Sequence, residues 1–205
     1  AEDGIRDVKE YAEMGYTYAV VIDLSKYFDT LNHEILLNLL RKNIKDERVI
    51  QLIKRNLKSG VMENGVVRET EEGSPQGGNL SPLLANIYLN EFDQEFAKRG
   101  VPCIRYADDI VLLAKSGRAA QRLLVTSTAY LEGKLKLTVN QEKSRTVSVF
   151  ARKNFKYLGF TLGKNGGGIF VRVHPKAWKK MKAKLKELAS RKRVQKLPIS
   201  LDKIK

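Results

Sequence analysis

Two aspartates stand side by side in the segment Tyr106-Ala107-Asp108-Asp109, between two runs of apolar residues. The pattern predicts a strand, a tight turn and a second strand, which places both carboxylates at the tip of a hairpin. Crowded carboxylates raise each other's pKa, and divalent cations that neutralise them keep them ionised. A metal site is therefore one interpretation. The other is that Asp is a common turn residue, and for an isolated pair this second interpretation is the better one.

A third carboxylate follows a run of β-branched and apolar residues, Tyr18 to Ile22. Asp23 comes directly after this run, which is the pattern of a buried strand that ends in an acid. A carboxylate in such a place costs free energy unless it is paired or bound to a metal. If this strand lies beside the hairpin, three carboxylates converge. They would then suit two Mg²⁺ ions about 3.5 to 4 Å apart, the arrangement that assists phosphoryl transfer.

Five segments resemble, in order and spacing, the motifs of the reverse transcriptases encoded by group II introns, which are often called maturases. They are DLSKYFDTLNH (23–33), SPQGGNLSPLLANIYL (74–89), YADD (106–109), NQEKS (140–144) and FKYLGF (155–160). The resemblance runs from about Gly4 to about Val173, and the long second segment is specific. Retrons and diversity-generating retroelements share the aspartates but differ around Gln76. The resemblance implies an RNA-directed DNA polymerase that also assists the splicing and mobility of intron RNA.

The resemblance also implies roles for the acidic residues. Asp23, Asp108 and Asp109 are expected to be catalytic and to hold two Mg²⁺ ions together with the carbonyl of Leu24. Asp23 and Asp108 would bridge both ions, and Asp109 would be more structural. A primer 3′-hydroxyl activated by one ion would attack the α-phosphate of a dNTP held by the other.

Three further residues are assigned to the incoming nucleotide by the same resemblance. Phe28 is similar to the family's steric gate, which rejects a 2′-hydroxyl, although from the sequence alone a core aromatic is the better interpretation. Gln76 resembles the residue that contacts the nucleotide. Lys143 resembles the lysine that protonates or neutralises the departing pyrophosphate, whereas an unassisted lysine is usually only solvated.

The template and the primer are assigned to the glycine-rich loop and to the fifth segment. Glycines permit close approach of the backbone to a base or template. The residues expected to contact template or primer are Ser74, Pro75, Gly77, Tyr157, Leu158 and Gly159.

Positive charge is concentrated in the last quarter of the chain. Residues 1–150 contain 21 Lys and Arg and 21 Asp and Glu, so the whole net charge of +15 lies in residues 151–205. Such a segment attracts a phosphate backbone without sequence preference, and a solvated lysine face is the alternative. The lysines expected to bind RNA are Lys179, Lys180, Lys182, Lys184 and Lys186.

The hydrophobic pattern predicts an α+β fold, with helices packed on one face of a mainly antiparallel sheet. Residues 1–174 are expected to form the reverse-transcriptase palm with part of the fingers, and residues 175–205 a basic helix that begins the thumb. This last helix carries an apolar stripe, which by default packs into its own domain. The expected helices are 5–14, 34–42, 47–57, 80–98, 118–131 and 176–191; the expected strands include 16–23, 135–139 and 146–150, and hairpins are expected around 64–65 and 164–168.

Composition excludes several classes of site. A single cysteine, Cys103, forms no internal disulfide, and with only His33 and His174 a Cys/His zinc site is not available. The sequence has no apolar stretch long enough to span a membrane and no signal peptide, and we expect a bacterial-type cytoplasmic setting. It leaves the oligomeric state open, a homodimer included.

The sequence supports a second function of another class. The chain would then be a splicing cofactor that binds structured intron RNA and uses the palm as a scaffold. The presence of all three aspartates favours polymerisation. By the resemblance, basic fingers residues would precede Ala1 and most of the thumb would follow Lys205. We therefore expect this chain to fold but to show little or no processive synthesis.

Overall fold

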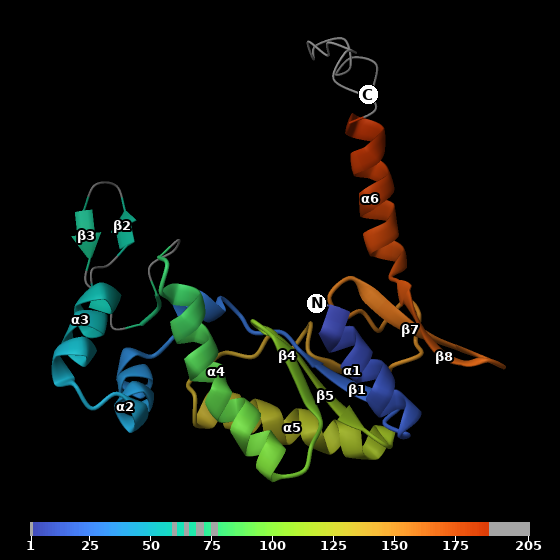
Figure 1. Cartoon of the computed structure of the whole chain (residues 1–205), viewed down its shortest axis with the longest axis horizontal. Coiled ribbons are helices and arrows are strands. Elements are labelled where there is room, and N and C mark those ends of the chain that lie inside the picture. Colours follow the sequence, from blue (N-terminus) through green and yellow to red (C-terminus); the bar gives the residue numbers. More distant parts are fainter. Residues whose placement is uncertain (1, 59–60, 64–65, 69–71, 75–77, 189–205) are drawn as a thin grey trace, which may run out of the picture.

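The computed structural model describes residues 2–58, 61–63, 66–68, 72–74 and 78–188. Its centre is a four-stranded sheet of order β4-β5-β1-β6, in which every neighbouring pair is antiparallel (Figure 1). The strands are β1 (Tyr18–Ile22), β4 (Cys103–Tyr106), β5 (Asp109–Ala114) and β6 (Arg145–Ser148). The predicted α+β class is confirmed.

One face of this sheet holds the main core. Side chains alternate between the two faces of a strand, and Ile22, Ile110 and Leu112 face α4 (Ser81–Lys98) and α5 (Gly117–Gly133). Phe92 and Phe96 of α4 are both fully buried there, with ring centroids 4.4 Å apart. Burial of one such ring contributes about 1.5–3 kcal/mol.

The other face is covered by α1 (Glu2–Glu13) and by the segment before β7. Ile5 and Val8 of α1 belong to the same buried cluster as Val111 and Leu113 of β5. Since every residue from Ile110 to Ala114 is apolar, both faces of β5 need cover. All helices were predicted on one face of the sheet, but the helix predicted over 5–14 covers the second face.

The segment between β1 and α4 contains five further elements: η1 (Tyr27–Asp29), α2 (His33–Asn43), α3 (Glu47–Lys58), β2 (Val61–Glu63) and β3 (Val66–Arg68). The predicted β2–β3 hairpin is confirmed, and its tip, 64–65, lies outside the described residues.

The predicted strand over 135–139 is wrong. This segment makes one isolated bridge, between Leu24 and Val139, because Lys136 adopts a left-handed conformation (φ 53°) that interrupts the extended path.

The chain ends its described part with β7 (Phe160–Asn165), β8 (Gly168–Val173) and α6 (Pro175–Leu188). Pro175 is the first residue of α6, as a helix N-terminus favours, and the expected last turn to residue 191 lies outside the described residues. No residue of α6 is buried, and the helix extends away from the sheet (Figure 1). Core packing of its apolar stripe is therefore not observed. No helix in the described ranges has the length and apolar character needed to cross a membrane.

Candidate active site at one end of the sheet

The two adjacent aspartates lie where the sequence places them, at the hairpin between β4 and β5. Tyr106 pairs with Asp109, so Ala107 and Asp108 form the turn and Asp109 is the first residue of β5. Ala107 has φ 55°, which is a left-handed conformation that residues other than glycine seldom adopt. Both aspartates are exposed to solvent.

Asp23 reaches the same end of the sheet. Ile22 pairs with Ile110, so the residue after β1 and the residue before Ile110 meet at one edge. The Asp23 backbone is fixed from the other side: its N–H donates to Ser144 Oγ at 3.0 Å, and its carbonyl accepts from the Asn140 N–H at 2.9 Å. The sequence segment that includes Ser144 therefore positions an acid 121 residues away from it in the chain.

Electrostatics links the three acids. Partial desolvation by neighbouring atoms raises the pKa of Asp109, the negative charges of Asp108 and Asp23 raise it further, and nearby Lys156 lowers it. The other two carboxylates thus oppose the ionisation of Asp109, as the sequence predicts for crowded acids. Lys156 is a member of the site that sequence reasoning missed.

The donors at this end fit a hard divalent cation in type and charge, because carboxylate and carbonyl oxygens are its preferred ligands. In an extended chain successive carbonyls point to opposite sides. The Asp23 carbonyl is bonded on the β6 side, so the Leu24 carbonyl faces the β5 side, where the hairpin lies. Within the described residues, however, no three His, Cys, Asp or Glu side chains are grouped closely enough to hold a metal as they stand.

Lys143 pairs with Asp23 in this arrangement. Its Nζ lies 3.7 Å from Asp23 Oδ1, and both side chains are substantially exposed. Such an exposed pair contributes about 1 kcal/mol or less. Lys143, predicted to face the nucleotide, therefore lies against a predicted metal ligand.

A cavity of about 740 Å³ opens beside the hairpin. Four of the sequence-predicted residues line it, namely Leu24, Phe28, Ser74 and Asp108. The remaining lining residues are Lys26, Tyr27, Asp29, Gly78, Asn79, Ser81 and Pro82. The structure thus brings the expected steric gate, two expected metal ligands and the start of the glycine-rich segment to one cavity.

Two walls of this cavity are bonded to each other. The Ser74 N–H donates to the Phe28 carbonyl at 2.8 Å, and the Gly73 N–H donates to the Leu31 carbonyl at 2.8 Å. The His33 Nε2 atom lies 2.6 Å from the Gly73 carbonyl. The buried Ser74 hydroxyl has no hydrogen-bond partner within the described residues.

Other predicted residues are placed differently. Pro75, Gln76 and Gly77 lie outside the described residues. The ring of Tyr157 is buried in the second core cluster, and a Cβ on Gly4 would lie 3.1 Å from it.

The FKYLGF segment (155–160) makes a tight turn near the site. Tyr157 and Phe160 exchange both backbone hydrogen bonds, and Leu158 and Gly159 have positive φ angles of 49° and 89°. Burial raises the pKa of Tyr157, and the charge of Asp109 raises it further. Contact with a primer from this turn would involve Leu158 and Gly159, since the Tyr157 side chain is buried.

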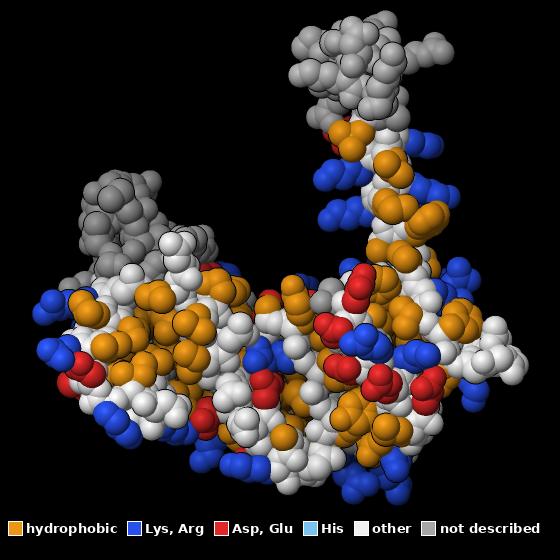
Figure 2. Space-filling model, viewed as in Figure 1, with side chains coloured by type: hydrophobic (Ala, Val, Ile, Leu, Met, Phe, Trp, Pro, Cys, Tyr) orange, Lys and Arg blue, Asp and Glu red, His pale blue; other side chains and the backbone are white. Residues whose placement is uncertain are grey.

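The five lysines assigned to RNA lie on α6 and are all exposed. Figure 2 shows basic side chains, which are all lysines in the sequence, along α6, and this helix stands clear of the rest of the molecule. Lys182 Nζ lies 5.3 Å from the centre of the Trp178 ring. Apolar and basic side chains share this helix without a partner surface among the described residues.

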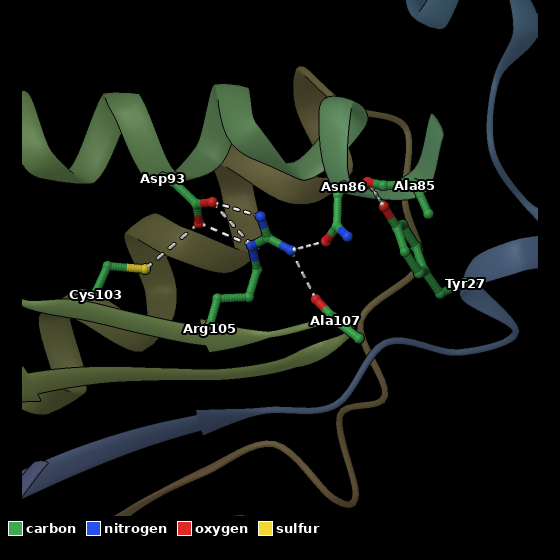
Figure 3. A network of polar contacts seen from close by, with 7 residues as sticks. All are labelled: Tyr27, Ala85, Asn86, Asp93, Cys103, Arg105 and Ala107. Carbon is green, nitrogen blue, oxygen red and sulfur yellow. Dashed lines mark hydrogen bonds and ion pairs between the residues drawn. The ribbon is translucent and has the colours of Figure 1, made fainter. Parts of the chain in front are cut away.

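A polar network at the hairpin was also missed by sequence reasoning. Arg105 of β4 contacts Asp93 and Asn86 of α4 and the carbonyl of Ala107 (Figure 3). The signal was present: a charged residue inside a short strand, and two polar residues seven positions apart on one helix face. Burial raises the pKa of the neighbouring Cys103 thiol to about 12, so the thiol stays protonated and unreactive at neutral pH.

Comparisons with known proteins agree with this geometry. Residues 2–162 match the family described as reverse transcriptase (RNA-dependent DNA polymerase). Protein YkfC of Escherichia coli (strain K12) is 34% identical over 196 residues, covering 77% of this chain and 51% of that protein. The group II intron-encoded protein LtrA of Lactococcus lactis subsp. cremoris is 46% identical over 80 residues, covering 39% of this chain and 13% of that protein.

The chain spans about half the length of the first of these relatives and a smaller share of the second. Among solved structures, the apo telomerase of Candida tropicalis truncated from its C-terminal domain has a TM-score of 0.63 and 14% identity. The match covers 84% of this chain and 39% of that one, and it concerns the fold alone. The relatives confirm the resemblance to group II intron-encoded proteins. The chain belongs to the reverse transcriptase family.

Proposed function

We propose that this chain is the catalytic palm of an RNA-directed DNA polymerase that extends a DNA primer on an intron RNA template. The observation that carries the proposal is the meeting of Asp23, Asp108 and Asp109 at one end of the sheet, beside a cavity lined by Phe28 and Ser74. The negative charge of these carboxylates would repel a triphosphate in the cavity, so the triphosphate could bind there only together with cations.

The acids would hold two Mg²⁺ ions, with Asp23 and Asp108 as the principal carboxylates and the Leu24 carbonyl as a further ligand. When bound, these ions supply activation of the primer 3′-hydroxyl and neutralisation of charge on the triphosphate. Asp109, which burial and its neighbours disfavour as an anion, supports the hairpin and adds charge at its edge.

The other residues of the cavity would select and orient the dNTP. The Phe28 ring lines the hollow and would exclude a 2′-hydroxyl, while the Ser74 hydroxyl would supply a hydrogen bond. Lys143 would hold the charge of Asp23 in the free protein and become available to the departing pyrophosphate once cations replace it.

A second role is favoured by α6, whose lysines are exposed and lie away from the cavity. We propose that this helix binds intron RNA through phosphate contacts and assists splicing, as the similarity to an intron-encoded protein suggests. Both roles would be exercised in the cytoplasm of a bacterial-type cell, as a monomer or a homodimer.

The test is addition of a single nucleotide to a DNA primer annealed to RNA, with the protein in excess so that weak binding does not limit the rate. We expect incorporation of the complementary dNTP only, dependent on Mg²⁺ and abolished by a chelator. The Phe28→Ala variant should accept ribonucleotides at least about tenfold more readily, since one lost steric contact is worth 1–3 kcal/mol. RNA binding with no template-directed addition would leave only the splicing role.

A further inference from the structure

The Arg105 guanidinium joins the acidic hairpin to α4. It contacts both carboxylate oxygens of Asp93 at 2.6 to 3.0 Å, and its Nη1 atom donates to Asn86 Oδ1 and to the Ala107 carbonyl, each at 2.9 Å (Figure 3). One planar group thus bonds two side chains of a helix and the backbone of a turn.

The bonded turn is the one that needs support. Ala107 has a left-handed backbone, and its methyl side chain offers no hydrogen bond that would stabilise this conformation locally. The residue that follows is Asp108, which lines the cavity. A turn that relaxed to an ordinary conformation would point this carboxylate elsewhere, because a change of φ at one residue reorients the next.

The support is itself rigid. Only 12% of the Arg105 side chain is exposed, against 30% for Asp93. Asp93 and Asn86 lie on α4, which is held in the main core by Leu89 and Phe92, both with no exposed surface. A bidentate guanidinium–carboxylate pair fixes direction as well as charge, and an ammonium group lacks this geometry.

We propose that Arg105 is a positioning residue, oriented by Asp93 and Asn86, that holds the Ala107 carbonyl and so keeps Asp108 aimed at the cavity. The inference rests on the proposed metal-dependent function and adds to it the group that determines the direction of one carboxylate. Arg105 does not touch the substrate in this view and acts only through the turn.

The affinity for a metal ion separates a positioning role of Arg105 from an effect of its charge. A cation near the hairpin repels a divalent ion, so loss of Arg105 would tighten metal binding if charge alone mattered. Arg105→Lys keeps the charge and removes the planar fork. Positioning predicts weaker metal binding by this variant, whereas a charge effect predicts no change.

The experiment is titration of the 205-residue chain with Mn²⁺, followed by electron paramagnetic resonance and normalised to the folded fraction. We expect Arg105→Lys to bind Mn²⁺ about five- to tenfold more weakly than the wild type, and Asn86→Ala about two- to threefold more weakly. The control is Arg99→Lys, because Arg99 also pairs with an acid of α4, Glu95, but within the described residues forms no hydrogen bond or ion pair with the turn. It should stay within twofold of the wild type.

Two results would overturn the proposal: unchanged Mn²⁺ affinity per folded molecule in Arg105→Lys, even with a lower melting temperature, or tighter binding. If the wild type binds no Mn²⁺, the proposed function fails, and amide hydrogen exchange then decides on Arg105 separately. Exchange at Asp108 and Asp109 should be at least about tenfold faster in Arg105→Lys. Equal exchange in both proteins would show that Arg105 does not hold the turn.

Discussion

Asp23 follows the buried Ile22 at the end of β1, and Asp109 precedes the buried Ile110 in β5. The lysines of α6, in contrast, lie on a helix in which no residue is buried. At the sheet end, hydrogen bonds with Ser144, Asn140 and Arg105 fix the backbone around the acids. On α6, the side chains are spread along an exposed surface (Figure 2).

The difference matches two physical requirements. Charges that stabilise a transition state act best when they are already in place before the substrate arrives. Charges that attract a phosphate backbone act over roughly 8–10 Å at ordinary salt and need only to be exposed. Under the proposed functions, the sheet end would carry the chemistry and α6 would attract RNA, and each prediction below tests this division.

The largest expected effect is on catalysis. Asp108→Asn should lower the rate of primer extension by at least about 10³-fold, since loss of a metal-holding charge removes most of the catalysis. The affinity for RNA should change less than twofold. Asp46→Asn, which removes an exposed acid near the start of α3, is the control for charge alone. Near-normal extension by Asp108→Asn would remove Asp108 from the site.

Substitutions at the core of the sheet domain should lower stability much more than substitutions on α6. Phe92→Ala should cost about 3–5 kcal/mol of unfolding free energy, because the ring is fully buried. Trp178→Ala on α6 should cost less than about 0.5 kcal/mol, because 47% of the residue is exposed. Chemical denaturation measures both. A large cost at Trp178 would show that α6 packs against a surface in solution.

RNA binding should depend on α6. Replacing Lys179, Lys180, Lys182, Lys184 and Lys186 together with Gln should flatten the slope of log K against log salt by up to about 3.5 units, if all five contact phosphate. Replacing the same five residues with Arg keeps the charge and should leave the slope in place. An unchanged slope and affinity in the Gln variant would return these lysines to a solvated helix face.

The smallest effect concerns Asp109 and pH. The pKa of Asp109 is raised in the folded chain, so the folded state binds the proton more tightly than the unfolded state does. The stability of the chain therefore falls as the pH rises from the ordinary pKa of Asp through the raised pKa of Asp109. Asp109→Asn should therefore stabilise the chain at neutral pH, by about 0.2–1 kcal/mol because the group is exposed. The gain should vanish below the ordinary Asp pKa. Thermal melts at neutral and acid pH, without divalent cations, test this, and a destabilised variant at neutral pH would contradict it.

Local sequence patterns were sufficient for the elements that carry the acids. The apolar run before Asp23 and the runs around Asp108 predict two adjacent strand ends, and both occur. What the patterns missed depends on contacts between distant residues. The Arg105–Asp93 pair joins a strand to a helix, and Ser144 bonds Asp23 across 121 residues. The periodicity of apolar residues does not predict which polar residues pair with each other.

Side-chain direction was also beyond the sequence. The FKYLGF segment was predicted to contact a primer, but burial of Tyr157 under α1 depends on the small size of Gly4, far away in the chain. Similarly, the residues 135–139 read as a strand until Lys136 takes a left-handed conformation, which no apolar pattern signals. These features follow from packing, and packing becomes known only with the fold.

The bonds between Gly73, Ser74 and the segment from Phe28 to His33 have an evolutionary consequence. A Cβ at Gly73 would lie 3.0 Å from the Asp29 carbonyl, and its φ of +88° already favours glycine. An insertion or a bulky substitution in either segment would therefore displace the other. The two walls of the cavity must change together, so drift in sequence should be far slower here than on α6, where each lysine can be exchanged alone.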